Sequence, residues 1–414
     1  MAILRLRRRG MTLGAAAAGA LLVAGLAGPA DARTTGGGLD TAALRTSLDA
    51  VHTAGMPGIY AQVRDGGETW NAASGVADVR TKRPVKPYMQ HRVGSVTKAF
   101  TSAALIQQVE KGRLNLDAPI GKYLPKLVTG QRGETITVRM LLNHTSGIGD
   151  YAMAAFPSLA KGSGADLVRY RFRTIAPTTL ARFGLAAAPT GTPGQKWSYS
   201  NTNYVIAGLL LRKLTGEDPE RYITANVIRR AGLRHTYFPR GPYILGPHSR
   251  AYESLYGVFD PPKDFSVYNM SWASTAGSLV STMDDLDRFY RALLGGRIVD
   301  RAGLAQMQRT VPTTSANLKY GLGIYSLSLP CGVFWGHDGA VFGQGTQVLS
   351  TPDGRRQVSL GYNLMKYQKL DANGVPQPSP IDTAMSDFLL KAACGDQAAA
   401  KSARTDTPLF PRTG

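Results

Sequence analysis

Strand-like segments occur near both ends of the chain and enclose a long helical middle, and this arrangement constrains the fold most strongly. Signals between Ser95 and Ala273 are mainly helical. Because strands from both ends need partners, we predict an α+β fold in which the two chain ends share one mostly antiparallel sheet with packed helices, and the middle forms an inserted, mainly helical lobe. The predicted strands are Pro57 to Val63, Thr69 to Val76, Tyr320 to Leu329, Gly332 to Trp335, Gly345 to Ser350 and Gln357 to Tyr362.

This pattern also predicts the domain boundaries. Residues 39–111 and 272–396 form a discontinuous sheet domain, residues 112–271 form a mainly helical domain, and a site lies in the cleft between them. Helices are expected at Leu39 to Ala54 and Ile381 to Ala393. Residues 397–414 have little periodic apolar content, so we predict a flexible tail.

The first 32 residues have the pattern of a signal peptide. Four arginines precede an uncharged stretch from Gly10 to Ala30 and a small-residue site at Ala30-Asp31-Ala32. We expect cleavage near Ala32, a secreted protein and no stable membrane span after processing. A retained anchor is the alternative, and the pair Arg8-Arg9 leaves both the general and the twin-arginine export routes open.

The chain is strongly basic, with a formal net charge of +20. The predicted leader holds four arginines against Asp31, so its removal leaves about +17. In an exported protein this charge favours non-specific attraction to anionic cell-wall polymers. The charges are scattered among both signs without a basic cluster, so nucleic-acid binding is not expected.

Cys331 and Cys394 are the only two cysteines. In an oxidising compartment they predict a single disulfide, with two inert buried thiols as the alternative. The chain has no Cys-x-x-Cys pair, no His-Glu-x-x-His spacing and no phosphate-binding glycine signature, so neither a metal nor another cofactor is expected. The Gly-x-Ser-x-Gly elbow of α/β-hydrolases is also absent.

The segment Ser95-Val96-Thr97-Lys98 opens a predicted helix. At a spacing of three residues the hydroxyl and the ammonium lie on one helix face, and the helix N-terminus favours a developing oxyanion. The tetrapeptide alone is weak evidence, because Ser158 to Lys161 repeats it and because Ser95 could simply cap the helix beside an exposed Lys98.

Two further motifs follow in chain order, Tyr199-Ser200-Asn201 and His337-Asp338-Gly339. The series is a variant of Ser-x-x-Lys, Ser-Asp-Asn and Lys-Thr-Gly, which occur in penicillin-binding proteins and β-lactamases. From about Leu39 to Cys394 the chain resembles the class C β-lactamases and the secreted serine D-alanyl-D-alanine carboxypeptidases of the β-lactamase/transpeptidase-like fold. Further matching segments are Arg92 to Gly94, Asn143 to Gly147, Ser271 to Ala273 and Tyr320 to Gly323.

The resemblance implies a serine acyl-enzyme. Ser95 is the expected nucleophile, Lys98 and Tyr199 carry the proton, and Asn201 binds the substrate amide. Backbone N–H groups of Ser95 and of Ala340, the residue after Gly339, are the expected oxyanion hole. The resemblance also places the two cysteines where such carboxypeptidases have their disulfide.

Three other residues have two interpretations each. His337 is either a polar partner of Tyr199 or a buried strand histidine bonded to backbone. His144, in a turn-forming sequence, is expected to hold a loop, and a catalytic role is the alternative. Trp272 either lines the mouth of the cleft or belongs to the core.

The chain departs from the carboxypeptidase pattern where the peptide carboxylate is recognised. Asp338 and Ala340 replace the expected hydroxyls, and the strand Ile324 to Leu327 has no arginine. Asp338 would repel a carboxylate by roughly 1 kcal/mol or more and would suit an amine. The alternative for Asp338 is a solvated charge on an edge strand.

The sequence therefore predicts a secreted, monomeric serine hydrolase acting on a peptidyl or β-lactam substrate. The leading hypothesis is a D-alanyl-D-alanine carboxypeptidase-type enzyme on cell-wall peptides that β-lactams acylate. A class C-like β-lactamase, a D-aminopeptidase and an esterase are alternatives, and a non-catalytic wall-binding module is the competing class.

Overall fold

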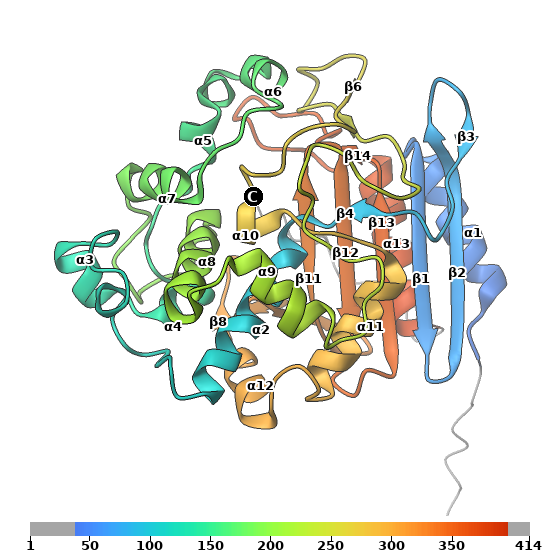
Figure 1. Ribbon diagram of the computed structural model, residues 1–414. Coiled ribbons are helices and arrows are strands. Elements are labelled where there is room, and N and C mark those ends of the chain that lie inside the picture. The colour runs from blue at the N-terminus through green and yellow to red at the C-terminus, as the bar shows by residue number, and fades with distance from the viewer. Residues whose placement is uncertain (1–37, 396–414) are drawn as a thin grey trace, which may run out of the picture. The chain divides into compact units, whose positions relative to one another are not determined.

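A computed structural model describes residues 38–395 of the chain (Figure 1). The predicted signal peptide, residues 1–32, and the predicted tail, residues 397–414, lie outside the described residues.

A nine-stranded antiparallel sheet brings the two ends of the described chain together. The strand order is β3-β2-β1-β13-β12-β11-β10-β9-β8, so β1 from the early part of the chain pairs with β13 from the late part. Figure 1 shows the blue strand β1 beside the orange-red strand β13. The strands of this sheet are β1 (Gly58–Asp65), β2 (Glu68–Asp78), β3 (Arg83–Pro84), β8 (Val311–Pro312), β9 (Leu318–Tyr320), β10 (Tyr325–Leu329), β11 (Gly332–Val341), β12 (Gln344–Ser350) and β13 (Arg356–Tyr362).

Helices cover the sheet and build the region between β4 and β7. The longer ones are α1 (Thr41–Thr53), α2 (Thr97–Glu110), α7 (Pro177–Ala186), α8 (Asn201–Thr215), α11 (Met283–Leu294), α12 (Arg301–Met307) and α13 (Pro380–Cys394). The shorter ones are α3 (Gly130–Thr135), α4 (Val138–Leu142), α5 (Ala152–Ala155), α6 (Ala165–Arg169), α9 (Pro219–Ile223) and α10 (Ser274–Gly277). Two-residue strands complete the fold: β4 (His91–Arg92), β5 (Tyr252–Glu253), β6 (Lys263–Asp264), β7 (Val280–Ser281) and β14 (Leu364–Met365).

Two hydrophobic clusters hold these layers together. One cluster packs α1 and α13 on one face of the sheet, with Leu48, Leu360 and Phe388 fully buried. The other joins α2 and α8 to α11 and includes Phe100, Leu210 and Val348. Helix α2 is buried from Thr97 to Gln108, as expected of a helix enclosed on all sides. This fold is the predicted β-lactamase/transpeptidase-like α+β fold, while the boundaries of a separate helical domain stay a prediction.

The structure differs from the strand expectations at two places near the site. The predicted strand Tyr320 to Leu329 is interrupted, and β9 and β10 flank Gly321 to Ile324, where Gly323 has a positive φ of 73°. In contrast, β11 runs six residues beyond Trp335, to Val341. Strand β10 pairs with β11 only as far as Gly336, so the later part of β11 reaches past its partner.

A disulfide joins Cys331 to Cys394, which confirms the expected bridge. It ties the end of α13 to the turn before β11. Between residues 38 and 395 no helix is both long and apolar enough to cross a membrane. The same residues contain no group of three or more His, Cys, Asp and Glu side chains arranged to hold a metal ion.

Candidate active site

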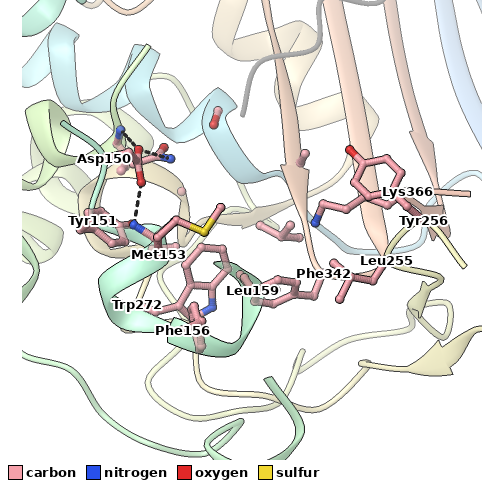
Figure 2. A pocket seen from close by; sticks show the side chains of 18 of the residues that line it. Asp150, Tyr151, Met153, Phe156, Leu159, Leu255, Tyr256, Trp272, Phe342 and Lys366 are labelled. Carbon is pink, nitrogen blue, oxygen red and sulfur yellow. Dashed lines mark hydrogen bonds between the residues drawn. The ribbon is translucent and has the colours of Figure 1, made fainter. Parts of the chain in front are cut away.

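A pocket of about 620 Å³ opens where the turn before α2, the start of α8 and the end of β11 meet. Ser95, Tyr199, Asn201 and Ala340 all line it, so the structure brings together residues that are far apart in the sequence. Figure 2 shows the apolar part of its wall. The labelled residues there include Tyr151, Met153, Phe156, Leu159, Leu255, Trp272 and Phe342.

Ser95 lies in a short 3₁₀ turn, Gly94–Val96, that leads directly into α2. The turn starts at Gly94, whose φ of 52° is in the left-handed region that favours glycine. Helix α2 then places Lys98 one turn after Ser95, and Lys98 Nζ lies 2.9 Å from Ser95 Oγ. The exposed-lysine alternative is therefore wrong, because Lys98 is fully buried.

The surroundings of Lys98 fit a neutral amine. Burial lowers the pKa of Lys98 to about 7, although the carboxylates of Asp150 and Asp338 oppose that shift. Nζ donates to Asn201 Oδ1 at 2.8 Å and to the carbonyl of Ala276 at 2.9 Å. A neutral amine has two N–H groups, and these two acceptors use both of them. In the ammonium form Nζ also donates to Ser95 Oγ at 2.9 Å. Once Nζ has lost that proton, its lone pair faces the Ser95 hydroxyl, as a general base requires.

Tyr199 completes the contacts of the nucleophile. Its phenol lies 2.7 Å from Ser95 Oγ and donates to it. Burial raises the pKa of Tyr199 well above 10, and nearby carboxylates raise it further against the opposing Ser95 hydrogen bond. Near neutral pH the phenol therefore keeps its proton and can give it to a leaving group.

His144 holds Tyr199 and the segment after it. The His144 ring lies 4.2 Å from the Tyr199 ring between centroids, and its Nδ1 accepts a hydrogen bond from the Ser200 N–H at 3.2 Å. Burial lowers the pKa of His144 well below its usual 6.5, so the ring is neutral. Its backbone φ is +62°, which fits the expected turn in this segment.

Asp150 is a residue of the site that the sequence did not reveal. Its Oδ2 accepts hydrogen bonds from the backbone N–H of Asn201 at 2.6 Å and from the Asn201 Nδ2 at 3.0 Å. Its Oδ1 accepts from the N–H of Ala152 at 2.8 Å. A single Asp three residues after Gly147 has no motif, so only the folded chain links it to Asn201.

The expected oxyanion hole requires two backbones to approach closely. A Cβ on Gly339 would lie 2.0 Å from the Val93 carbonyl oxygen, and a Cβ on Gly94 would lie 2.7 Å from the Ala340 nitrogen. Glycine at both positions therefore lets β11 lie directly against the turn that carries Ser95. Ser95 and Ala340 line the same pocket, so the role of their N–H groups stays a geometrically supported prediction.

His337 does not meet Tyr199 as one interpretation expected. Within the described chain its Nδ1 donates to the Asp338 carbonyl and its Nε2 accepts from the Tyr320 hydroxyl at 2.7 Å. Burial and the nearby Lys98 lower the pKa of His337 to about 3. His337 is thus a neutral strand histidine bonded to backbone, and it supports the site through Tyr320, whose ring packs against that of Tyr199.

Asp338 is buried, with 8% of its surface exposed, so the expectation of a solvated edge charge is wrong. It is the cross-strand partner of Gln347, which in turn pairs with Leu360 on the face covered by α1 and α13. Asp338 is not among the described residues that line the pocket. Of those residues only Asp150 and Lys366 carry full charges.

Trp272 lines the pocket and also packs on the core, so both of its interpretations hold. Its ring lies 4.8 Å from Phe342 and 5.8 Å from Phe156 between centroids. Together these rings form an apolar wall of the pocket that Ser95 also lines (Figure 2).

The fold, the buried Ser95 and Lys98, and the partly buried Tyr199 define a serine hydrolase of the β-lactamase and transpeptidase type. Comparison with known families agrees, because the family model described as Beta-lactamase matches residues 42–373. The chain belongs to the β-lactamase family.

Three known proteins are similar to this chain, and the second of them, below 25% identity, shows the fold alone. The structure of a D-stereospecific amidohydrolase from Streptomyces sp. is 34% identical with a TM-score of 0.75, and the match covers 86% of this chain and 99% of that one. A D-amino acid amidase from Ochrobactrum anthropi SV3 is 24% identical with a TM-score of 0.72, covering 85% and 97%. The "Putative penicillin-binding protein PbpX" of Bacillus subtilis (strain 168) is 28% identical over 66% of this chain, which spans only 62% of that protein's length.

Proposed function

We propose that this protein hydrolyses amide bonds next to D-amino acids with apolar side chains, through an acyl-enzyme on Ser95. The observation that carries the proposal is the position of Ser95 Oγ, 2.9 Å from Lys98 Nζ and 2.7 Å from the Tyr199 hydroxyl. A serine hydroxyl between a neutral amine and a phenol that keeps its proton has both a base and an acid at hand.

The proposed reaction has two halves. Ser95 Oγ attacks the amide carbon while Lys98 takes its proton, and backbone N–H groups hold the oxyanion. Tyr199 then donates its proton to the leaving amine and is reprotonated from Lys98, whose Nζ lies 4.7 Å above the Tyr199 ring. In the second half water attacks the acyl carbon and gives its proton to Lys98. The bond between the acyl carbon and Ser95 Oγ then breaks, the proton returns to Oγ through the same groups, and the free acid leaves.

The pocket supports the choice of substrate. Phe156, Trp272 and Phe342 offer an apolar surface beside Ser95, which suits a large apolar side chain. The acidic residue of the pocket is Asp150, so a substrate amine is attracted there and not to Asp338. The Streptomyces relative, which is 34% identical over nearly its whole length, is described as a D-stereospecific amidohydrolase.

A D-alanyl-D-alanine carboxypeptidase that β-lactams acylate is the second candidate. The name of the Bacillus subtilis relative favours it. Strand β10 (Tyr325–Leu329) argues against it, because it has no arginine where the carboxypeptidases that the chain resembles bind the peptide carboxylate.

We also propose that the protein acts outside the cytoplasm. The disulfide between Cys331 and Cys394 supports an oxidising compartment, and the charged leader followed by an apolar stretch supports export. The net charge of +20 supports loose attraction to anionic wall polymers there.

The test is a substrate panel on the full chain, with Ser95→Ala as control: D-Phe p-nitroanilide, L-Phe p-nitroanilide, diacetyl-Lys-D-Ala-D-Ala and nitrocefin. We expect the D-anilide to be cleaved fastest and the Ser95 variant to be inactive. Dominant release of D-Ala would establish the carboxypeptidase instead. If no substrate is turned over and neither a fluorescent penicillin nor a fluorophosphonate labels the protein, the protein is a non-catalytic module.

A further inference from the structure

Lys366 places a positive charge in the wall of the Ser95 pocket. It follows β14 directly and lines the pocket, and Figure 2 shows its ammonium reaching inwards from the side opposite Asp150. Its side chain is 22% exposed, so the charge is only partly solvated. A cation at this depth interacts with an anion more strongly than an exposed lysine does.

The surrounding structure holds this ammonium in position. Nζ lies 3.8 Å from Oε2 of Glu253 and 5.3 Å from the centre of the Phe342 ring. Glu253 is fully buried, and its two carboxylate oxygens accept hydrogen bonds from the backbone N–H groups of Leu255 at 2.9 Å and Gly343 at 3.1 Å. Because a lysine ammonium has three donors, a single long contact with Glu253 leaves donors for the pocket.

The backbone at Lys366 is in an unusual conformation. Lys366, Leu255 and Tyr256 have positive φ values of 49°, 49° and 60°, and all three line the pocket. The N–H of Tyr256 donates to the carbonyl of Lys366 at 2.6 Å, which joins the two segments. Left-handed backbone at residues other than glycine costs energy and is concentrated at functional sites.

We propose that Lys366 binds a carboxylate of the substrate, and hence that a short D-peptide with a free carboxylate is cleaved faster than the same peptide whose carboxylate has been converted to a neutral amide. This inference rests on the proposed amide hydrolysis and deepens it. It gives the pocket the cation that β10 (Tyr325–Leu329) lacks, on a different part of the fold.

The experiment compares D-Phe-D-Ala with D-Phe-D-Ala amide, two substrates that differ only in the terminal carboxylate. We expect the full-length wild type to favour the carboxylate at least about fivefold in kcat/KM, as a charge-assisted hydrogen bond provides. Lys366→Gln should bring the ratio close to one, and Lys366→Arg should restore most of it. Glutamine adopts a left-handed φ as readily as lysine, and Glu253 keeps its two backbone donors, so the variant should fold.

Lys369→Gln is the matched control, because Lys369 is an exposed lysine three residues away that does not line the pocket. It should keep the wild-type ratio. An unchanged ratio in Lys366→Gln would overturn the inference while leaving the amidase proposal intact. If neither peptide is cleaved, the amidase proposal fails, and the inference is then tested by binding. Each peptide is added before a fluorophosphonate, and the slowing of Ser95 labelling is measured. The inference is supported if the carboxylate peptide slows labelling more than its amide does and Lys366→Gln abolishes this difference, and it is contradicted if both peptides slow labelling equally.

Discussion

Asp150 fixes the side-chain amide of Asn201. One carboxylate oxygen accepts both the Asn201 backbone N–H at 2.6 Å and its Nδ2 at 3.0 Å, which turns Oδ1 of the amide towards Lys98. The carboxylate therefore orients one of the two acceptors that hold the Lys98 amine, and its charge also raises the pKa of that amine. Asp150 is in this sense a positioning residue for the base.

Replacing Asp150 with Asn should move the pH dependence of activity. The loss of the negative charge lowers the Lys98 pKa further, so the acid limb of kcat/KM should shift to lower pH. We also expect kcat to fall about tenfold, because the Asn201 amide loses its strongest acceptor. Steady-state pH profiles of both proteins check this, and an acid limb that stays in place would show that Asp150 does not act through Lys98.

In the wild type, kcat/KM should rise with pH through about 7, the pKa of the buried Lys98. The sign follows from the role of the amine, since only the deprotonated form accepts the Ser95 proton. Tyr199, with its pKa well above 10, contributes no limb below that range. Lys98→Ala and Tyr199→Phe should each cost about 10² to 10⁴ in kcat. A profile that falls between pH 6 and 8 would contradict a neutral lysine base.

Gly339→Ala should damage both stability and activity. The new Cβ would lie 2.0 Å from the Val93 carbonyl oxygen and 3.0 Å from the Ser95 nitrogen, so β11 and the Ser95 turn must separate. We expect a loss of at least about 2 kcal/mol in the free energy of unfolding. Gly241→Ala is the matched control, because nothing lies within 4 Å of its Cβ, and it should change stability by less than about 0.5 kcal/mol. Denaturant titration of both variants, with activity measured in parallel, decides the point.

The disulfide should contribute substantially to stability. Cys331 and Cys394 are 63 residues apart in sequence, and closing a loop of that size stabilises a fold by about 2 to 4 kcal/mol. The double substitution to serine should lower the free energy of unfolding by this amount, and a reductant should lower that of the wild type equally. The serine variant provides the control, because the reductant should not affect it. Equal stability of oxidised and reduced wild type would show that the bridge is dispensable.

Much of the fold and the centre of the site could be predicted from local patterns. Alternating and helical apolar periodicity located β1, β2, β12, β13, α1 and α13 to within a few residues, because each pattern reflects which face of an element is buried. The spacing of Ser95 and Lys98 implied their contact, because three residues along a helix bring two side chains to one face. Tyr199 and Asn201 followed from their motif, and the structure places both at Ser95, while their catalytic roles stay predictions.

Tertiary structure alone decided the charges of the pocket and the partners of His144 and His337. Asp150 and Lys366 reach the pocket from loops 216 residues apart, and neither belongs to a pattern that could be recognised beforehand. Asp338, which the motif placed near the substrate, is instead buried in the sheet beside Gln347, because its face follows from strand register with β12. Periodicity and motifs depend on local properties of a short segment, such as which of its faces is buried and which side chains share one face. Which distant side chains meet, and how burial shifts their pKa values, is set only when the two ends of the chain pair in one sheet.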